Sequence, residues 1–196
     1  ATRWYRAPEI LLSSYRYTTG VDMWACGCIL GELINGKPIF PGSSTMNQLD
    51  RILEITGRPS AEDVESIQSP LAATLLNSMK APATPRLESR FPGASPEALD
   101  LLSKLLHFNP EKRLSAEEAL RHPYVAQFSN PEDEPVAERT ITIPIDDNTK
   151  YSIQQYRERL YLEIVKKKKM IREKMRKKEE ARRKKDKERE KEKERR

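Results

Sequence analysis

The stretch Val21 to Asn35 reads VDMWACGCILGELIN, and it decides the fold. Wound as a helix, it has apolar residues on every side, and such a helix belongs inside a protein or in a membrane. It is too short to span a bilayer, and it contains Asp22 and Glu32. We therefore expect a buried central helix, with the Asp22 carboxylate at its positive first turn and Gly36 as its left-handed stop.

Charge divides the chain into a mildly acidic body and a strongly basic tail. Residues 166–196 contain 19 Lys or Arg and 8 Asp or Glu, a net charge of +11, whereas residues 1–165 carry −5. A run of this composition cannot bury a core. Its Glu–Lys and Glu–Arg neighbours at helical spacing favour a solvated helix, so we expect one exposed helix continuing from Ser152.

The basic tail has two interpretations. It is either a solvated spacer or an electrostatic handle for an acidic partner such as nucleic acid, an anionic membrane or acidic tubulin tails. The tail has no aromatic residues on which bases could stack, and no sustained apolar face for membrane insertion. As a handle, it favours an acidic protein polymer or a nonspecific polyanion.

The two cysteines argue for a reducing compartment. Cys26 and Cys28 lie two residues apart on the apolar helix, which suits neither a disulfide framework nor a metal site. We expect two buried free thiols, and therefore a cytoplasmic protein, with the nucleus and the ciliary cytoskeleton as alternative locations. The sequence shows no signal peptide and no transmembrane segment. It starts inside a loop-like motif at Ala1, so we expect a fragment of a longer chain.

Caps and apolar spacing predict further short helices and no strands. Ser60–Asp63 and Ser115–Glu118 have the pattern of a capping box, as does Thr45–Gln48. Ser95-Pro96 opens another amphipathic helix. The remaining predictions are a short helix at 8–12, a helix after Ser69-Pro70, an extended loop at 80–94, an extended strap at 129–151, and a last helix whose first turns dock through Ile153, Tyr156, Leu160 and Ile164.

Four motifs in order resemble the large lobe of eukaryotic protein kinases. Residues 1–9, ATRWYRAPE, resemble the end of the activation segment, with Ala7-Pro8-Glu9 as the A-P-E motif. The run DMWACG at 22–27 is similar to the start of the kinase central helix. NPEKR at 109–113 and HPY at 122–124 resemble the arginine partner of the A-P-E glutamate and the end of the last core helix.

Finer features are similar to the mitogen-activated protein (MAP) kinases. These features are the form of ATRWYRAPE, the insert at 57–80 and the strap NPEDEP at 130–135. The runs at 56–64 and 151–161 are closest to the atypical, long-tailed branch, the mitogen-activated protein kinase fifteen type. No Gly-rich loop, V-A-I-K, H-R-D or D-F-G motif is present, so ATP and Mg²⁺ would bind residues of the full-length kinase outside this chain and not this fragment.

The resemblance assigns roles to the first residues. Thr2 would support the catalytic loop through its hydroxyl. Arg3 and Arg6 would hold the phosphotyrosine of the activated loop, since a guanidinium fork matches phosphate oxygens. Trp4 and Arg6 would border the shallow pocket that accepts proline after the phosphorylated Ser or Thr. The alternative for Thr2, Arg3 and Arg6 is an ordinary surface residue.

The resemblance also names structural anchors. Glu9 and Arg113 would form a buried ion pair between the activation segment and the helical core. Asp22 would accept backbone N–H groups of the catalytic loop, and Trp24 would simply pack in the core. We expect the two histidines, at positions 107 and 122, to be structural.

An acidic patch falls where MAP kinases bind basic docking peptides. It consists of Glu132, Asp133 and Glu134, and the sequence departs from the family at Asn130, where an aspartate is usual. Loss of one acidic group weakens the attraction, and salt already screens exposed charges. A docking patch and a plain solvated strap both remain open.

Together these features predict a mostly α, protein-kinase-like C-terminal lobe built around a buried central helix and followed by a long basic helix. The expected domains are the lobe (1–128), the docking strap (129–151) and the charged tail (152–196). We expect part of a monomeric, proline-directed serine/threonine kinase that binds protein substrates and docking peptides, with the fragment alone inactive. The alternatives are a noncatalytic kinase-like scaffold that binds filaments through its tail, and a general polyanion-binding module.

Overall fold

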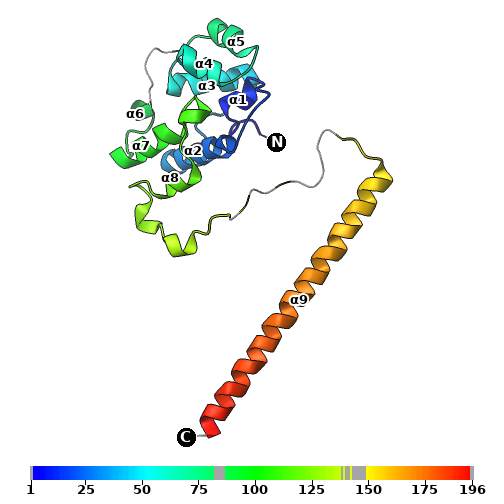
Figure 1. The fold of residues 1–196 in the computed structure, drawn as a ribbon. Coiled ribbons are helices and arrows are strands. Elements are labelled where there is room, and N and C mark those ends of the chain that lie inside the picture. Colours follow the sequence, from blue (N-terminus) through cyan, green and yellow to red (C-terminus); the bar gives the residue numbers. More distant parts are fainter. Residues whose placement is uncertain (1, 82–86, 138, 140–141, 143–148, 195–196) are drawn as a thin grey trace. The chain divides into compact units, whose positions relative to one another are not determined.

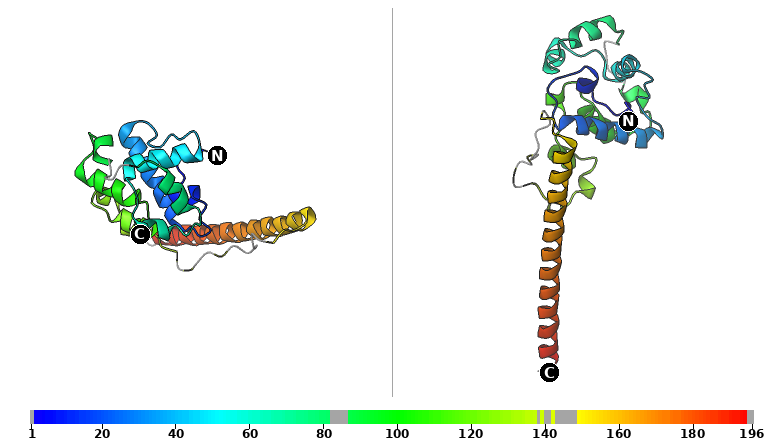
Figure 2. Two further views of the ribbon diagram at one scale, coloured as in Figure 1. Left: turned by 90° about the horizontal axis from the view of Figure 1, so that it is seen from above. Right: turned by 90° about the vertical axis from the view of Figure 1, so that its right-hand side faces the viewer.

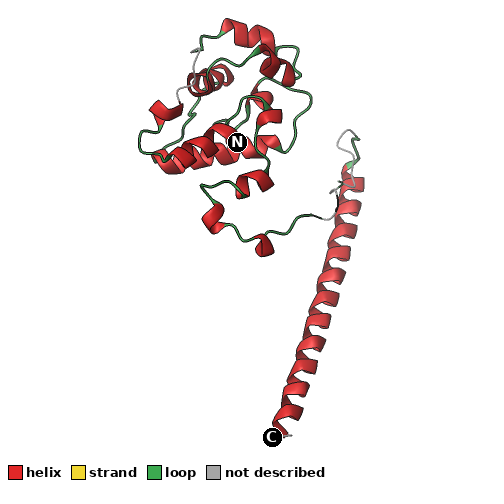
Figure 3. Ribbon diagram, turned by 60° about the vertical axis from the view of Figure 1, so that its left-hand side comes forward, coloured by secondary structure: helices red, strands yellow, loops and turns green. Residues whose placement is uncertain are grey.

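The structure is a computed structural model that describes residues 2–81, 87–137, 139, 142 and 149–194, with side chains of the last helix described as far as Arg183. It divides into two units, Ala1–Val136 and Ala137–Arg196, so that the division falls inside the predicted strap. Each unit is described by itself. Helices and loops make up the described residues, and Figure 3 shows no strand among them.

The first unit is organised around α2, Gly20–Asn35 (Figure 1). The helix begins one residue before the predicted Val21. It ends as expected at Gly36, which has a φ of 71° and donates its N–H to the Glu32 carbonyl. Helix α7, Pro96–Leu105, packs along α2. A Cβ added at Gly27 would lie 2.8 Å from Leu106 Cδ2, so this glycine permits the close approach of the chain at α7.

The expectation that α2 is enclosed on every side is wrong for the described residues. Its buried residues are Trp24, Gly27, Cys28 and Gly31. The opposite face carries an exposed strip formed by Asp22, Cys26, Ile29 and Leu33. These residues follow one another at intervals of four, three and four, which places them on one side of the helix. Ile29 is 52% exposed and Leu33 76% exposed. Hydropathy measures what a residue prefers, and it does not reveal which face the rest of the described unit covers.

Cys26 corrects a second expectation. Cys28 is buried, as predicted, but the Cys26 thiol is exposed. Residues two apart on a helix lie on different faces, because 3.6 residues make a turn. Since α2 is covered on one side only, one of the two thiols remains accessible.

The short helices of the first unit also contact one another. Helix α1 contacts α3, α4 contacts α5, and α6 contacts both α3 and α7. Their bounds, with those of the remaining short elements of this unit, are α1 Pro8–Leu11, α3 Thr45–Thr56, α4 Ala61–Ser66, α5 Ala72–Ser78, α6 Leu87–Arg90, η1 Pro110–Lys112, α8 Ala116–Leu120, η2 Ala126–Phe128 and η3 Pro131–Asp133. Helix α6 and the 3₁₀ turn η3 lie in segments that the sequence predicts to be extended.

Side-chain caps explain where several helices begin. The capping boxes Ser60–Asp63 and Ser115–Glu118 are confirmed, and Ser95 accepts the Ala98 N–H at the start of α7. The box expected at 45–48 is wrong. Ser44 caps α3 by accepting the Asn47 N–H. The Ser44 hydroxyl, one residue before Thr45, caps a free N–H of the first turn equally well. The Gln48 side chain is then not needed for a capping box and can bond other partners.

The core of the first unit joins these elements. Trp24 stacks on Phe40 with ring centroids 5.7 Å apart, and both side chains are buried. The other large side chains at the centre are Leu12, Leu49, Ile52, Leu53, Ile55, Ile67, Phe91 and Leu102. The core therefore draws on α2, α3 and α7 together with the segment around α1.

The second unit is dominated by α9, Ile153–Glu194, a helix of 42 residues (Figure 2). At 1.5 Å per residue it is roughly 63 Å long. Ion pairs such as Arg183–Glu179, at 2.8 Å, run along it. The expected single exposed helix is confirmed for the described side chains, whereas docking of its first turns stays a prediction. Among the described helices, none combines the length and hydropathy that a membrane span requires.

Candidate functional site

The expected ion pair between Glu9 and Arg113 is present. Arg113 Nη1 lies 2.9 Å from Glu9 Oε1, and Nη2 lies 3.1 Å from Oε2, so the guanidinium faces the carboxylate with two parallel bonds. Glu9 is 1% exposed and Arg113 6% exposed. The pair joins residues 104 positions apart and ties α1 to the region of η1.

The remaining donors of Arg113 are also used. Its Nε donates to the His107 carbonyl at 3.2 Å, and its Nη1 also donates to the Gly20 carbonyl at the start of α2. The guanidinium carbon lies 5.3 Å from the centroid of the Trp24 ring. A buried charge is tolerated when it is both paired and fully hydrogen-bonded, and Arg113 meets both conditions.

Residues Thr2–Arg6, the segment assigned to substrate recognition, are held against the loop that precedes α3. Arg3 Nη1 donates to the Ser43 carbonyl at 2.9 Å. Trp4 Nε1 donates to the Gly42 carbonyl at 3.1 Å. Trp4 is 37% exposed and Arg6 is exposed. Side chains of both residues therefore reach the surface from a fixed backbone.

Tyr5 and Gln48 complete this attachment. The Tyr5 hydroxyl donates to Glu32 Oε2 on α2 at 2.6 Å, and this hydrogen bond, followed by burial, raises the pKa of Tyr5. Gln48 Nε2 donates to the Trp4 carbonyl at 3.1 Å. Sequence reasoning missed Gln48 as a functional residue, because its position three residues after Thr45 suggested a capping role.

Thr2 and Asp22 occupy the surface. Thr2 is exposed, and its Oγ1 accepts the Trp4 N–H at 3.4 Å. Asp22 is exposed in the first turn of α2, on the strip that also contains Ile29 and Leu33. The expected partner of both side chains, the catalytic loop, is not part of this sequence, so their roles stay predictions.

Two of the acidic residues of the strap accept hydrogen bonds from neighbouring polar residues of the strap. Asp133 Oδ2 accepts from Asn130 Nδ2 at 2.8 Å, and Glu134 Oε1 accepts from Ser129 Oγ at 2.9 Å. Glu132, Asp133 and Asn130 are exposed at η3. Asn130, the departure from the family pattern, therefore binds the Asp133 carboxylate. The docking role of the patch stays a prediction.

Both histidines have structural partners. His107 Nδ1 accepts the Asn109 N–H at 3.2 Å, and burial lowers the pKa of His107. His122 is buried, with Nε2 2.8 Å from Asp100 Oδ2. Within the described part of the chain, no cluster of His, Cys, Asp or Glu side chains is arranged to hold a metal ion.

Asp63 links the insert to the core. Its Oδ1 accepts from Asn109 Nδ2 at 3.1 Å and from Lys112 Nζ at 2.9 Å. Burial alone would raise the pKa of Asp63, but the hydrogen bonds from Lys112, Ser60 and Asn109 outweigh it and lower the pKa to about 2. The carboxylate thus fixes α4 against η1.

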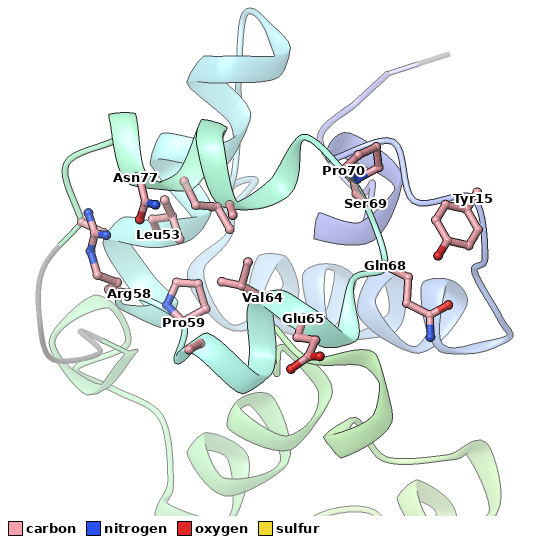
Figure 4. A pocket seen from close by; sticks show the side chains of 14 residues that line it. Tyr15, Leu53, Arg58, Pro59, Val64, Glu65, Gln68, Ser69, Pro70 and Asn77 are labelled. Carbon is pink, nitrogen blue, oxygen red and sulfur yellow. The ribbon is translucent and has the colours of Figure 1, made fainter.

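A hollow of about 770 Å³ lies between α3, α4 and α5 (Figure 4). Leu53, Val64 and Pro59 supply apolar wall, and Arg58 and Glu65 place opposite charges at it. Arg58 Nη2 donates to the Met79 carbonyl at 2.8 Å, which ties that side chain to the end of α5. Most of the lining residues belong to the insert at 57–80, and none belongs to the Thr2–Arg6 segment.

The helical lobe, the Glu9–Arg113 pair and the anchored Thr2–Arg6 segment together define a kinase large lobe. The model of the protein kinase domain matches residues 1–125, and this chain belongs to that family. Relatives of the chain include MAP kinases. It is 64% identical over 170 residues to extracellular signal-regulated kinase 2 of Dictyostelium discoideum, covering 86% of this chain and 46% of that protein.

The atypical branch is represented among the relatives. The chain is 53% identical over 173 residues to mitogen-activated protein kinase 15 of Xenopus laevis, covering 88% of this chain and 30% of that protein. The identity to mitogen-activated protein kinase 15 of Caenorhabditis elegans is 49% over 170 residues, covering 86% of this chain and 36% of that protein. The chain thus spans less than half the length of these relatives. The resemblance to MAP kinases is confirmed.

Proposed function

We propose that this chain is part of a proline-directed serine/threonine protein kinase that transfers the ATP γ-phosphate to proteins. The observation that carries the proposal is the buried Glu9–Arg113 pair, which fixes the base of the Thr2–Arg6 segment to the core. A kinase accelerates phosphoryl transfer mainly by positioning and electrostatics, so a rigid substrate-facing segment is a requirement of the chemistry.

The residues of this chain supply substrate positioning. Arg3 and Arg6 bring two guanidinium groups to one short surface segment, which suits a phosphate on the preceding loop. Trp4 offers a partly exposed ring beside Arg6, which suits the flat apolar ring of a substrate proline. Thr2 presents a hydroxyl at the end of the segment that would face the catalytic loop.

ATP and Mg²⁺ would be held elsewhere in the complete kinase. None of the motifs that bind nucleotide or metal occurs in this sequence, so its residues do not fit either role. The cofactor pair supplies the phosphoryl group and neutralises its charge. What this chain contributes is the geometry of the acceptor side.

The exposed strip of α2 supports the same proposal. Ile29 and Leu33 expose apolar side chains on a helix whose other face is core, and Asp22 lies at the first turn of the same strip. In the complete kinase, we infer, the segment that carries the catalytic loop packs along this strip. Asp22 would then accept backbone N–H groups of that loop.

The acidic residues of η3 fit a docking role. Glu132, Asp133 and Glu134 would attract basic docking peptides of protein partners. Reversing all three charges in the complete kinase should weaken binding of a basic docking peptide, measured by titration. Unchanged affinity would leave the strap as a solvated connection.

Phosphoryl transfer tests the proposal. We expect the complete kinase, with ATP and Mg²⁺, to phosphorylate peptides containing Ser-Pro or Thr-Pro. Arg6→Ala should lower the rate, because the substrate segment loses its exposed cation. Arg90→Ala, which changes a cation at the far end of α6, serves as the matched control and should retain the wild-type rate. Absence of transfer by the complete wild-type protein would refute the proposal.

A second function, polyanion binding by α9, is favoured by charge. Cations outnumber acidic residues along the described part of the helix from Lys166 onward, and no apolar face interrupts them over several turns. Such a helix would bind an acidic polymer such as tubulin tails or nucleic acid in the cytoplasm, in the nucleus or at a ciliary cytoskeleton. Binding must weaken steeply as salt rises, because each contact releases counterions.

Measurement of phosphoryl transfer distinguishes the kinase hypothesis from the scaffold hypothesis. A noncatalytic scaffold predicts filament binding by the complete protein without phosphoryl transfer. A general polyanion-binding module predicts that residues 150–196 alone reproduce the whole affinity. The kinase predicts transfer whether or not the tail contributes to binding.

A further inference from the structure

Gln48 is an uncharged side chain that is completely buried, at 0% exposure, next to the substrate-facing segment. Its Nε2 donates to the Trp4 carbonyl at 3.1 Å. Its Oε1 accepts the Gly42 N–H at 3.1 Å, a hydrogen that the Phe40 carbonyl shares at 2.9 Å. One side chain on α3 therefore joins two backbone segments that are 38 positions apart.

The glutamine amide meets both partners without carrying a charge. A carbonyl needs a donor and an N–H needs an acceptor, and the glutamine head group offers one of each on a rigid plane. Methionine has a similar length but lacks the donor. Glutamate also lacks the donor and would bring a charge into a buried site, which is costly without a partner.

The approach of Gly42 to this amide is close. A Cβ added at Gly42 would lie 2.3 Å from Gln48 Oε1 and 2.7 Å from its Cα. Atoms cannot approach so closely, so a side chain here would displace either the loop or the glutamine. The absence of a side chain at Gly42 and the amide at Gln48 are thus two parts of one contact.

The same contact determines where the Trp4 ring lies. Trp4 Nε1 donates to the carbonyl of Gly42, and the Trp4 carbonyl accepts from Gln48, so the residue is held by its backbone and by its indole. Trp4 is nevertheless 37% exposed. Gln48 itself is buried and cannot touch a substrate, so any effect that it has on a substrate must pass through Trp4.

We propose that Gln48 is a positioning residue that fixes Trp4 against Gly42 and thereby sets the preference for the residue that follows the phosphorylated Ser or Thr. This inference rests on the proposed kinase function. It adds a residue, on α3, that shapes recognition without contacting the substrate.

The test is Gln48→Met in the complete kinase, assayed with two peptides that differ only in Pro or Ala after the acceptor serine. We expect the ratio of kcat/KM for the Pro peptide to kcat/KM for the Ala peptide to fall about tenfold, because an unmet backbone carbonyl releases Trp4. Leu102→Ala is the control. It opens the core at a buried residue of α7, and it should leave this ratio unchanged even where it lowers the amount of folded enzyme.

Hydrogen exchange gives a readout that does not depend on activity. In Gln48→Met, amides of residues 2–6 and 41–48 should exchange at least several-fold faster, whereas those of α7 should not change. The assignment is overturned if Gln48→Met keeps the wild-type peptide ratio, or if exchange in both segments stays as in the wild type. A wild-type protein that phosphorylates neither peptide would refute the proposed kinase function, and exchange alone would then decide the role of Gln48.

Discussion

Removing Arg113 should destabilise the lobe more than removing any exposed arginine. Glu9 is 1% exposed in the wild-type structure, and in Arg113→Ala its carboxylate loses both guanidinium bonds. The carbonyls of His107 and Gly20 lose their donor as well. The substitution therefore affects three polar groups at one buried point: one carboxylate and two carbonyls.

The magnitude follows from the buried charge that remains. Breaking one partner of a buried ion pair costs about 3–5 kcal/mol, since the other charge cannot return to water. For domains of about 150–250 residues, each kcal/mol lowers the melting temperature by roughly 2–4 °C, and the shift is smaller for a longer chain. Using the low end of this range, we expect Arg113→Ala to lower the melting temperature of the complete kinase by roughly 6–10 °C.

The assay compares three variants by thermal unfolding. Arg90→Ala is the matched control, because Arg90 is an exposed arginine at the end of α6. It should change the melting temperature by no more than a degree or two, roughly the effect of an ordinary surface substitution. Adding Glu9→Gln to Arg113→Ala should recover part of the loss, because the lone charge disappears. Equal shifts for Arg113→Ala and Arg90→Ala would refute the reasoning.

Three further results are expected. Gly27→Ala should destabilise the lobe by about 1–3 kcal/mol in urea unfolding, since its new Cβ meets side chains at 2.8–2.9 Å, whereas Gly93→Ala, with open space around it, should be close to neutral. The pKa of Asp63, about 2 in the folded state against 3.8 ordinarily, means that its stabilisation is present above pH 4 and is lost as the pH falls towards 2. Asp63→Asn should therefore flatten the acid limb of a stability–pH curve, and an unchanged limb would contradict the assignment. Burial raises the pKa of Cys28 to about 12, so a maleimide at pH 8 should label Cys26 first in the 196-residue chain, and mass spectrometry showing the reverse order would contradict the described burial.

Local signals in the sequence were sufficient for several helix starts. Ser60 and Ser115 each precede an acidic residue by three positions, and both boxes form, because their hydrogen bonds depend on a few neighbouring residues. The stop at Gly36 is of the same kind. The cap of α3 was predicted one residue too late. Ser44 and Thr45 both carry a hydroxyl group, and the structure uses that of Ser44.

Burial was harder to predict than helix formation. The apolar residues of α2 predict a helix, but nothing in Ile29 or Leu33 indicates that they are exposed. Cys26 was misplaced for the same reason. Coverage depends on contacts with distant segments, and periodicity carries no information about them.

The candidate site likewise contains one feature that the sequence predicts and one that it does not. The Glu9–Arg113 pair could be predicted, because the resemblance joins two motifs that lie far apart in the sequence. The role of Gln48 could not be predicted, because its partners are backbone groups of Trp4 and Gly42. Every residue has such groups, so the sequence does not indicate which of them a side chain will bond. The signal that could have raised the question was a glutamine in an otherwise apolar row of α3.

The most direct test of the kinase assignment is the residue preference of the complete protein on a peptide array in which the position after the acceptor varies through all residues. With ATP and Mg²⁺, we predict phosphate on Ser and Thr, with proline preferred at the following position. Transfer without any preference for proline would contradict the role given to Trp4 and Arg6, and no transfer to any peptide would contradict the account as a whole.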